Sequence, residues 1–114
     1  MSAPNRDSAS LWDMLQAIQN LQNFLTHTSY EDYCQNLLLQ SAVERQLEIL
    51  GEAARRLSPT LQAQHPEIDW AGLVGLRNII AHRYDAIRLD LIWETTQTKL
   101  DPLKQQLQAI LPHT

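Results

Sequence analysis

Residues 77–84, RNIIAHRY, gather side chains that could act on a phosphodiester. Arginine binds phosphate through its planar guanidinium, and histidine transfers protons near neutral pH. Together they suit cleavage of RNA, in which a base activates the 2′-hydroxyl, an acid protonates the leaving oxygen and a cation stabilises the charged phosphorane. That reaction needs two proton carriers, whereas the segment supplies one histidine, His82. A dimer would supply two.

The spacing of these residues on a helix raises a geometric problem. At 100° per residue, Arg77 and His82 lie about 140° apart around the axis. Asn78 and His82 lie about 40° apart, and Arg77 and Tyr84 about 20°. Either the helix ends near Ala81 and the chain turns His82 back, or two copies of the chain share the site. A symmetric dimer with facing segments would bring two arginines and two histidines together.

The sequence gives no indication of a metal site or of an activated serine or cysteine. The histidines show no HxxxH spacing, the single Cys34 has no second cysteine nearby, and no GxSxG sequence occurs. The four histidines are His27, His65, His82 and His113. We therefore expect neither a bound metal nor a cofactor.

The net charge of −4 is unusual for a nucleic-acid-binding protein, whose surface is normally basic. Six of the nine basic residues are arginines in the middle of the chain, and helical packing could gather them on one surface. They are Arg45, Arg55, Arg56, Arg77, Arg83 and Arg88. The competing interpretation is that they are solvated and paired with neighbouring acids, and charge alone favours it.

Composition predicts an all-α fold. The 114 residues suit one domain, residues 1–114, in which residues 1–8 are expected to be flexible. Leucine, glutamine and alanine dominate, and all three favour helices. The lone cysteine favours a reducing compartment, and neither a signal peptide nor a membrane-spanning segment is recognisable. We expect a cytoplasmic protein without membrane contact.

Apolar residues at helical spacing predict the first two principal helices. The first is expected to start at Ser8 or Ser10 as its cap. Its stripe is Leu11, Met14, Leu15, Ile18, Leu21 and Leu25. Residues 29–58 are expected to form one helix or two pieces, beginning with a capping box at Ser29 and Asp32. Their stripe is Leu38, Ala42, Val43, Leu47, Leu50, Ala54 and Leu57. Gly51 costs about 1 kcal/mol there, which a close helix–helix crossing would offset.

Two further helices complete the expected bundle. After a short turn or loop at 61–68, a helix capped by Asp69 leads into the RNIIAHRY segment, with Leu73, Leu76 and Ile80 inward. Residues 88–111 form the last helix, which Pro102 should kink or divide. Its inward residues are Leu91, Trp93, Leu100, Leu103, Leu107, Ile110 and Leu111. Short loops between four principal helices predict an up-and-down bundle with short helical turns added.

The segment RNIIAHRY resembles the R-x4-H-x-Y motif of the HEPN superfamily, and specifically that of HepT-like toxins paired with minimal nucleotidyltransferase antitoxins. The stretches AVERQLEILGEAARRLS and IDWAGLVGLRN, and the helix of Trp93, support the resemblance, which covers residues 11–111. It implies an all-α HEPN-type fold and a homodimer whose two motifs face each other across a cleft. It also implies metal-independent RNA cleavage, with tRNA among the substrates.

The resemblance also implies roles for individual residues. Arg77 and His82 would be the catalytic pair, and Asn78 would orient the histidine or the phosphate. Tyr84 would accept AMP, which the partner nucleotidyltransferase transfers from ATP to neutralise the toxin. Arg83 is a supporting candidate at a position that the motif leaves free. Glu52 in GEA matches a family feature, and the sequence leaves open whether it serves structure or site.

Structural interpretations compete with these roles. His82 could be a histidine that the helix dipole favours at a C-terminus, Arg77 an ordinary ion-pair arginine and Tyr84 a half-buried aromatic residue. Trp12, Trp70 and Trp93 suit the core or an interface better than base stacking. The alternative function is a HEPN subunit that helps a nucleotidyltransferase hold its substrate and cuts nothing. The sequence does not specify the RNA, the cut position, the number of AMP units or the stoichiometry with the partner.

Overall fold

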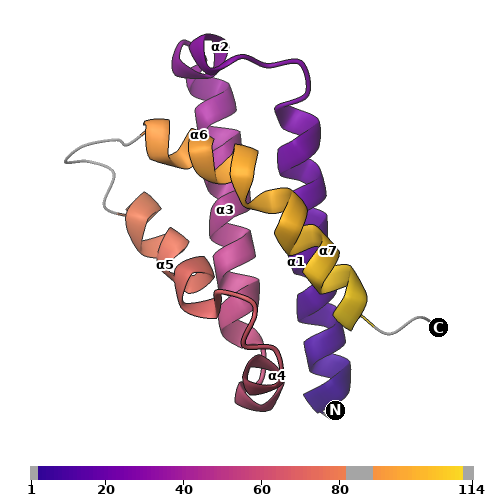
Figure 1. Cartoon of the computed structure of the whole chain (residues 1–114). Helices are drawn as coiled ribbons and strands as arrows, with labels where there is room; N and C mark the ends of the chain where they lie inside the picture. Colours follow the sequence, from indigo (N-terminus) through magenta and orange to yellow (C-terminus); the bar gives the residue numbers. More distant parts are fainter. Residues whose placement is uncertain (1–2, 82–88, 112–114) are drawn as a thin grey trace.

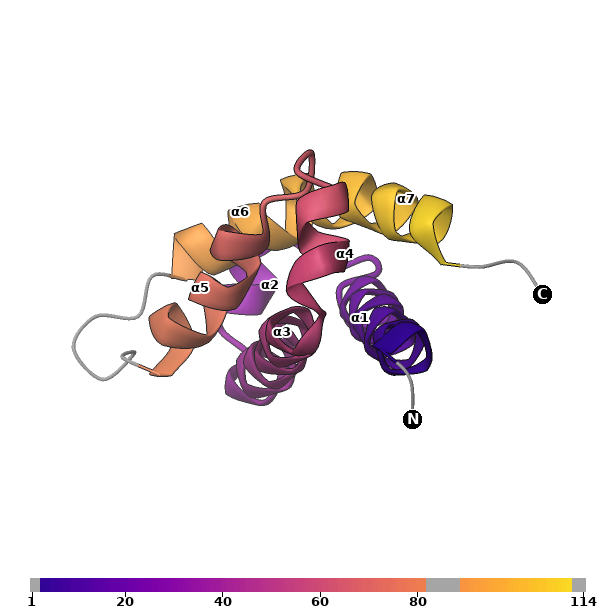
Figure 2. The same cartoon turned by 90° about the horizontal axis from the view of Figure 1, so that it is seen from below.

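The computed structural model describes residues 3–81 and 89–111, whose regular structure is entirely helical. The elements are α1 (Ala3–Phe24), α2 (Tyr30–Cys34), α3 (Leu37–Arg56), α4 (Pro59–Gln64), α5 (Trp70–Ala81), α6 (Leu89–Thr98) and α7 (Leu100–Ile110). Helices α1 and α3 run antiparallel, α5 lies beside α3, and α6 and α7 cross one side of the α1–α3 pair (Figure 1, Figure 2). The predicted all-α bundle is therefore confirmed, with α6 and α7 together as its fourth member.

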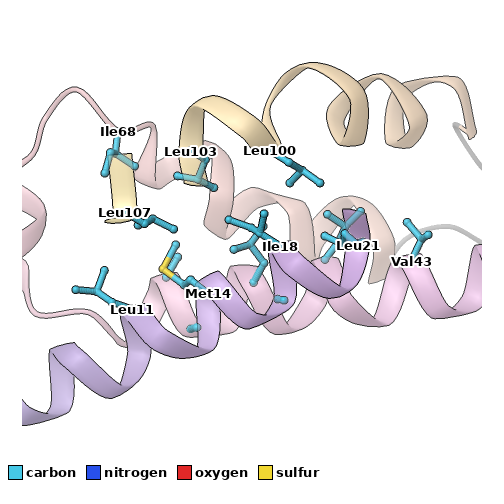
Figure 3. Packing of buried hydrophobic residues seen from close by; sticks show 14 of the residues in the cluster. Leu11, Met14, Ile18, Leu21, Val43, Ile68, Leu100, Leu103 and Leu107 are labelled. Atoms are coloured by element: carbon cyan, nitrogen blue, oxygen red, sulfur yellow. The ribbon is translucent and has the colours of Figure 1, made fainter. Parts of the chain in front are cut away.

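The core fills the space between α1, α3 and α7. Buried side chains from the three helices point toward one another in Figure 3. They include Leu11, Met14, Ile18 and Leu21 of α1, Val43, Leu47 and Leu50 of α3, and Leu100, Leu103 and Leu107 of α7. Leu73 and Leu76 of α5 pack against this core, and Ile80 belongs to it. The 3.6-residue period of these positions is what allowed the sequence to predict them. Among the described helices, none is long and apolar enough to cross a membrane.

Polar caps separate the second predicted helix into two pieces. The capping box is confirmed: the Asp32 backbone N–H donates to Ser29 Oγ, and the Ser29 N–H donates to Asp32 Oδ2. Asn36 then starts α3 by accepting from the Leu39 N–H at 3.0 Å. The buried Gln40 side chain donates to the carbonyl oxygens of Tyr33 and Cys34, which fastens α2 to α3.

The predicted start of the first helix was wrong. Helix α1 begins at Ala3, so Ser8 and Ser10 lie inside it. The reason is a tertiary contact: the buried Asp7 carboxylate accepts hydrogen bonds from the Ser58 N–H at 2.9 Å and from Ser58 Oγ at 2.7 Å. Ser58 also caps α4, so the first turns of α1 are tied to the start of α4. The expected flexibility of residues 1–8 stays a prediction.

Two leucines predicted to face inward are exposed instead. Leu38 is 82% exposed, because α2 and Gln40 occupy the inner side of the first turn of α3. Leu91 is 37% exposed, and Ile92 and Thr96 of α6 are buried in its place. Thr96 and Ile92 lie four and eight residues before the buried Leu100, so the buried face of α7 continues into α6 and does not include Leu91.

Proline divides the last helix, as the sequence predicted. Helix α6 ends at Thr98, and α7 starts at Leu100 with Pro102 as its third residue. Proline is tolerated in the first turn of a helix because the N–H that it lacks has no partner within that helix. Around the break, the Lys99 N–H still donates to the Thr95 carbonyl oxygen and the Leu103 N–H to that of Lys99. The two pieces therefore stay continuous in hydrogen bonding while changing direction.

Gly51 marks the close crossing of α3 and α5 that the sequence predicted. A Cβ added there would lie 2.8 Å from the carbonyl oxygen of Leu73 and 3.7 Å from the backbone nitrogen of Arg77. The first distance is too short for a real carbon, so any side chain at this position would push the helices apart. The missing Cβ thus allows α5 to approach α3 at the turn that carries Arg77.

We expect Gly51→Ala to lower the free energy of unfolding by about 1–2 kcal/mol, measured by urea denaturation. Overpacking costs roughly 1–3 kcal/mol, and improved helix propensity returns up to about 1 kcal/mol. Gly75→Ala is the matched control in α5, because a Cβ there meets no atom within 4 Å. It should stabilise the protein by up to about 1 kcal/mol. Equal stabilisation by both substitutions would show that the crossing at Gly51 is not tight.

Candidate active site

Helix α5 holds the backbone of Arg77 in a fixed position because both ends of the helix are anchored. At its start, Asp69 Oδ1 accepts from the Gly72 N–H at 3.0 Å, which confirms Asp69 as the predicted cap. The buried Trp70 indole donates to the His65 carbonyl oxygen at 2.9 Å. At the other end, Ile80 is buried in the core. Arg77 lies between these anchors with 56% of its side chain exposed.

A surface hollow of about 310 Å³ lies between α3 and α5 beside Arg77. We call it the arginine hollow. Its lining residues are Arg45, Glu48, Ile49, Glu52, Arg56 and Arg77. Three arginines against two glutamates give it a surplus of positive charge, although the chain as a whole is acidic. A second hollow, of about 270 Å³ between α1 and the α6–α7 pair, has no basic residue in its lining. The arginine hollow is therefore the better place for an anionic ligand.

The carboxylate of Glu52 bridges two arginines at the rim of the arginine hollow. Glu52 Oε2 lies 3.4 Å from Arg77 Nη1, and Glu52 Oε1 accepts a hydrogen bond from Arg55 Nη2 at 2.7 Å. The hydrogen bond from Arg55, joined by the charges of Arg77 and Arg56, holds the pKa of Glu52 below its ordinary value despite partial burial. Glu52 is therefore ionised at neutral pH, and Arg77 faces a negative charge.

The predicted site residues fall into two groups. Arg77 and Asn78 are exposed on α5. His82, Arg83 and Tyr84 lie outside the described residues, as does Arg88. How His82 approaches Arg77, from the same chain or from a second copy, therefore stays a prediction. Within the described part of the chain, Arg45, Arg56 and Arg77 do share one surface, as the sequence allowed.

Glu48 was not among the predicted site residues, and the sequence left the role of Glu52 open. A signal was present, because residues 45, 48, 49, 52 and 56 recur at the spacing of one helical face beside the buried stripe of α3. What the spacing could not show is that α5 packs along this face and adds Arg77 to it. The ion pair between Glu52 and Arg77 depends on that packing.

The tryptophans have three different environments. Trp70 is buried in the core, as expected. Trp93 is half-buried and packs against Tyr30 and Tyr33, with ring centroids 5.8 and 5.5 Å away. Trp12 is exposed on α1, so it is not a core residue. None of the three lines the arginine hollow.

Comparison with known proteins places this chain in a family. The family model described as "Ribonuclease HepT-like" matches residues 14–110. The chain is 30% identical to "Putative RNase MJ1380" of Methanocaldococcus jannaschii, over 90% of this chain and 94% of that protein. It is 31% identical to "Putative RNase TTE0752" of Caldanaerobacter subterraneus subsp. tengcongensis, over 86% and 88%. It is 29% identical to "Probable ribonuclease HepT" of Thermococcus cleftensis, over 88% and 91%. No solved structure shows a significant match. The chain belongs to the HepT-like ribonuclease family.

Proposed function

We propose that this protein is a metal-independent RNA endonuclease and the toxin of a toxin–antitoxin pair. The observation that carries the proposal is the placement of Arg77 in a HepT-like ribonuclease chain. This arginine, the first residue of the R-x4-H-x-Y motif, is exposed at the rim of a hollow lined by two further arginines. A non-catalytic member of the family would have no need of the whole motif, which this sequence retains.

The proposed reaction is an internal transfer of the phosphate in RNA. One His82 accepts the proton of the 2′-hydroxyl, whose oxygen attacks the adjacent phosphorus. The bond from phosphorus to the 5′-oxygen breaks, and a second proton carrier protonates that oxygen. Arg77 stabilises the charge on the pentacoordinate phosphorus through its guanidinium. The products are a 2′,3′-cyclic phosphate and a 5′-hydroxyl.

The need for two proton carriers supports a homodimer in which each motif faces its copy. Large exposed apolar side chains, among them Trp12, Leu37, Leu38 and Ile79, offer surface that a second copy could cover. Sedimentation at tens of micromolar should show a dimer, whereas a monomer at that concentration would refute the shared site.

We also propose that tRNA is a substrate and that a minimal nucleotidyltransferase silences the toxin. The partner would transfer AMP from ATP to the hydroxyl of Tyr84 and release diphosphate. The tethered nucleotide would add a negative charge and compete with RNA for the arginines of the arginine hollow. After incubation with the partner and ATP, the mass of the chain should rise by one or more AMP units on Tyr84. A Tyr84→Phe variant that is silenced just as durably would refute the covalent mechanism.

Incubating the purified chain with total RNA, with and without EDTA, separates the proposed enzyme from the alternative binding subunit. We expect fragmentation at the same rate in both conditions, since no step above requires a metal ion. Activity that disappears in EDTA and returns with Mg²⁺ would contradict the mechanism. Intact RNA in both conditions would favour the non-catalytic subunit.

A further inference from the structure

We infer that Glu52 is a positioning residue that holds the guanidinium of Arg77 at the rim of the arginine hollow. The inference rests on the proposed function, because it assigns Arg77 to the phosphate of RNA. Arginine has a long side chain with four rotatable bonds, and Arg77 is more than half exposed. Without a contact near its end, the guanidinium would sample many orientations before RNA arrives. Glu52 supplies a contact from the neighbouring helix.

The backbone crossing at Gly51 fixes the distance over which this contact acts. Gly51 is the residue next to Glu52, and a Cβ on it would lie 3.7 Å from the backbone nitrogen of Arg77. The starting points of the Glu52 and Arg77 side chains are therefore set by packed backbones rather than by mobile loops. The resulting separation between Glu52 Oε2 and Arg77 Nη1 is 3.4 Å.

A carboxylate against a phosphate-binding arginine also competes with the phosphate, and Arg55 limits that competition. Arg55 takes the shorter contact with Glu52, at 2.7 Å against 3.4 Å for Arg77. Only the Arg55 contact has hydrogen-bond geometry. Glu52 is therefore held mainly by Arg55 and orients Arg77 through a longer ion pair that an incoming phosphate can outcompete. Loss of the carboxylate should disorder Arg77 without weakening the attraction of the hollow for RNA.

The kinetic test compares Glu52→Gln with the matched control Glu94→Gln. Glu94 is an exposed glutamate on α6 that does not line the arginine hollow, and its side chain forms no ion pair or hydrogen bond with a described residue. Both variants remove one negative charge, so both should leave KM for a cleavable RNA oligonucleotide unchanged or lower it. Only Glu52→Gln should lower kcat, by about tenfold, because a misplaced catalytic group loses rate in the chemical step. A kcat within twofold of the wild type would overturn the inference.

A second measurement tests the contact without any cleavage. In the ¹⁵N-labelled protein, the Nε–Hε signal of Arg77, assigned by its loss in Arg77→Lys, should report a more mobile side chain in Glu52→Gln and an unchanged one in Glu94→Gln. Equal mobility in the wild type and Glu52→Gln would overturn the positioning role. If the wild type cuts no RNA, the proposed function fails, and the mobility of Arg77 still decides whether Glu52 holds it.

Discussion

Replacing Arg77 with alanine is expected to lower kcat/KM for RNA cleavage by about 10²–10³-fold. This is the cost typical of removing one group that stabilises the charge of a transition state. Arg77 lines the arginine hollow, so its loss should also weaken RNA binding. The fold should tolerate the change, because the side chain is exposed and its ion pair with Glu52 is a surface pair. Cleavage rates under single-turnover and saturating conditions separate the two effects.

The matched control for Arg77→Ala is Arg6→Ala. Arg6 is an exposed arginine on α1 that does not line the arginine hollow, so its removal changes the net charge by the same amount. We expect cleavage within about twofold of the wild type. In an inactive background, Arg77→Ala should reduce the salt dependence of RNA binding by the equivalent of about one phosphate contact. Full cleavage activity in Arg77→Ala would exclude it from the site.

The second large effect is expected for His82→Ala, which should lower the rate of RNA cleavage by at least about 10²-fold. In a dimer, the two copies of His82 are the proposed carriers of the two proton transfers, so the substitution removes both. The wild-type rate should then follow a bell-shaped pH profile, with one histidine required unprotonated and the other protonated. The rate is measured on RNA in EDTA across about pH 5 to 9, which spans the range in which histidine titrates.

His27→Asn is the control for His82→Ala. His27 is an exposed histidine with a φ of 60°, in the left-handed region that asparagine tolerates. This variant should cleave RNA like the wild type. If His82 only stabilises the end of a helix, its replacement would lower the free energy of unfolding by about 0.3–2 kcal/mol and leave the activity of the folded protein intact. Loss of activity with unchanged stability is the result that supports catalysis.

Local signals in the sequence were enough to predict most of the fold. The stripe of α1 and the capping box at Ser29 depend on residues within one or two turns of each other, so the spacing alone identifies them. Gly51 could be interpreted as a crossing because glycine in a helix interior is costly unless something fits against it. In each case the structure places the residue as the pattern indicated.

The errors came from contacts between distant segments. The start of α1 depends on Asp7 meeting Ser58, more than fifty residues away in sequence. Leu38 is exposed because α2 folds back over α3 through Gln40. No helical periodicity contains this information, since it arises only when the elements pack together.

The candidate site shows the same division. The residue types and spacing of the RNIIAHRY segment indicated phosphate chemistry and selected Arg77. The arginine hollow required α3 and α5 to be placed side by side, and so did the contact between Arg77 and Glu52. A helical wheel of either helix alone shows half of this surface. The wide angle between Arg77 and His82 on an ideal helix remains the strongest argument from sequence for a site shared by two chains.

The most direct test of the proposed activity is the chemistry of the cut ends. The wild-type chain is incubated in excess EDTA with an RNA oligonucleotide that it cleaves, and the fragments are weighed by mass spectrometry. We predict a 2′,3′-cyclic phosphate on the upstream fragment, a 5′-hydroxyl on the downstream fragment, and no cleavage when the nucleotide before the cut carries a 2′-hydrogen. A 3′-hydroxyl and a 5′-phosphate, or cleavage of the 2′-deoxy substrate, would contradict attack by the 2′-oxygen and with it the roles proposed for His82 and Arg77.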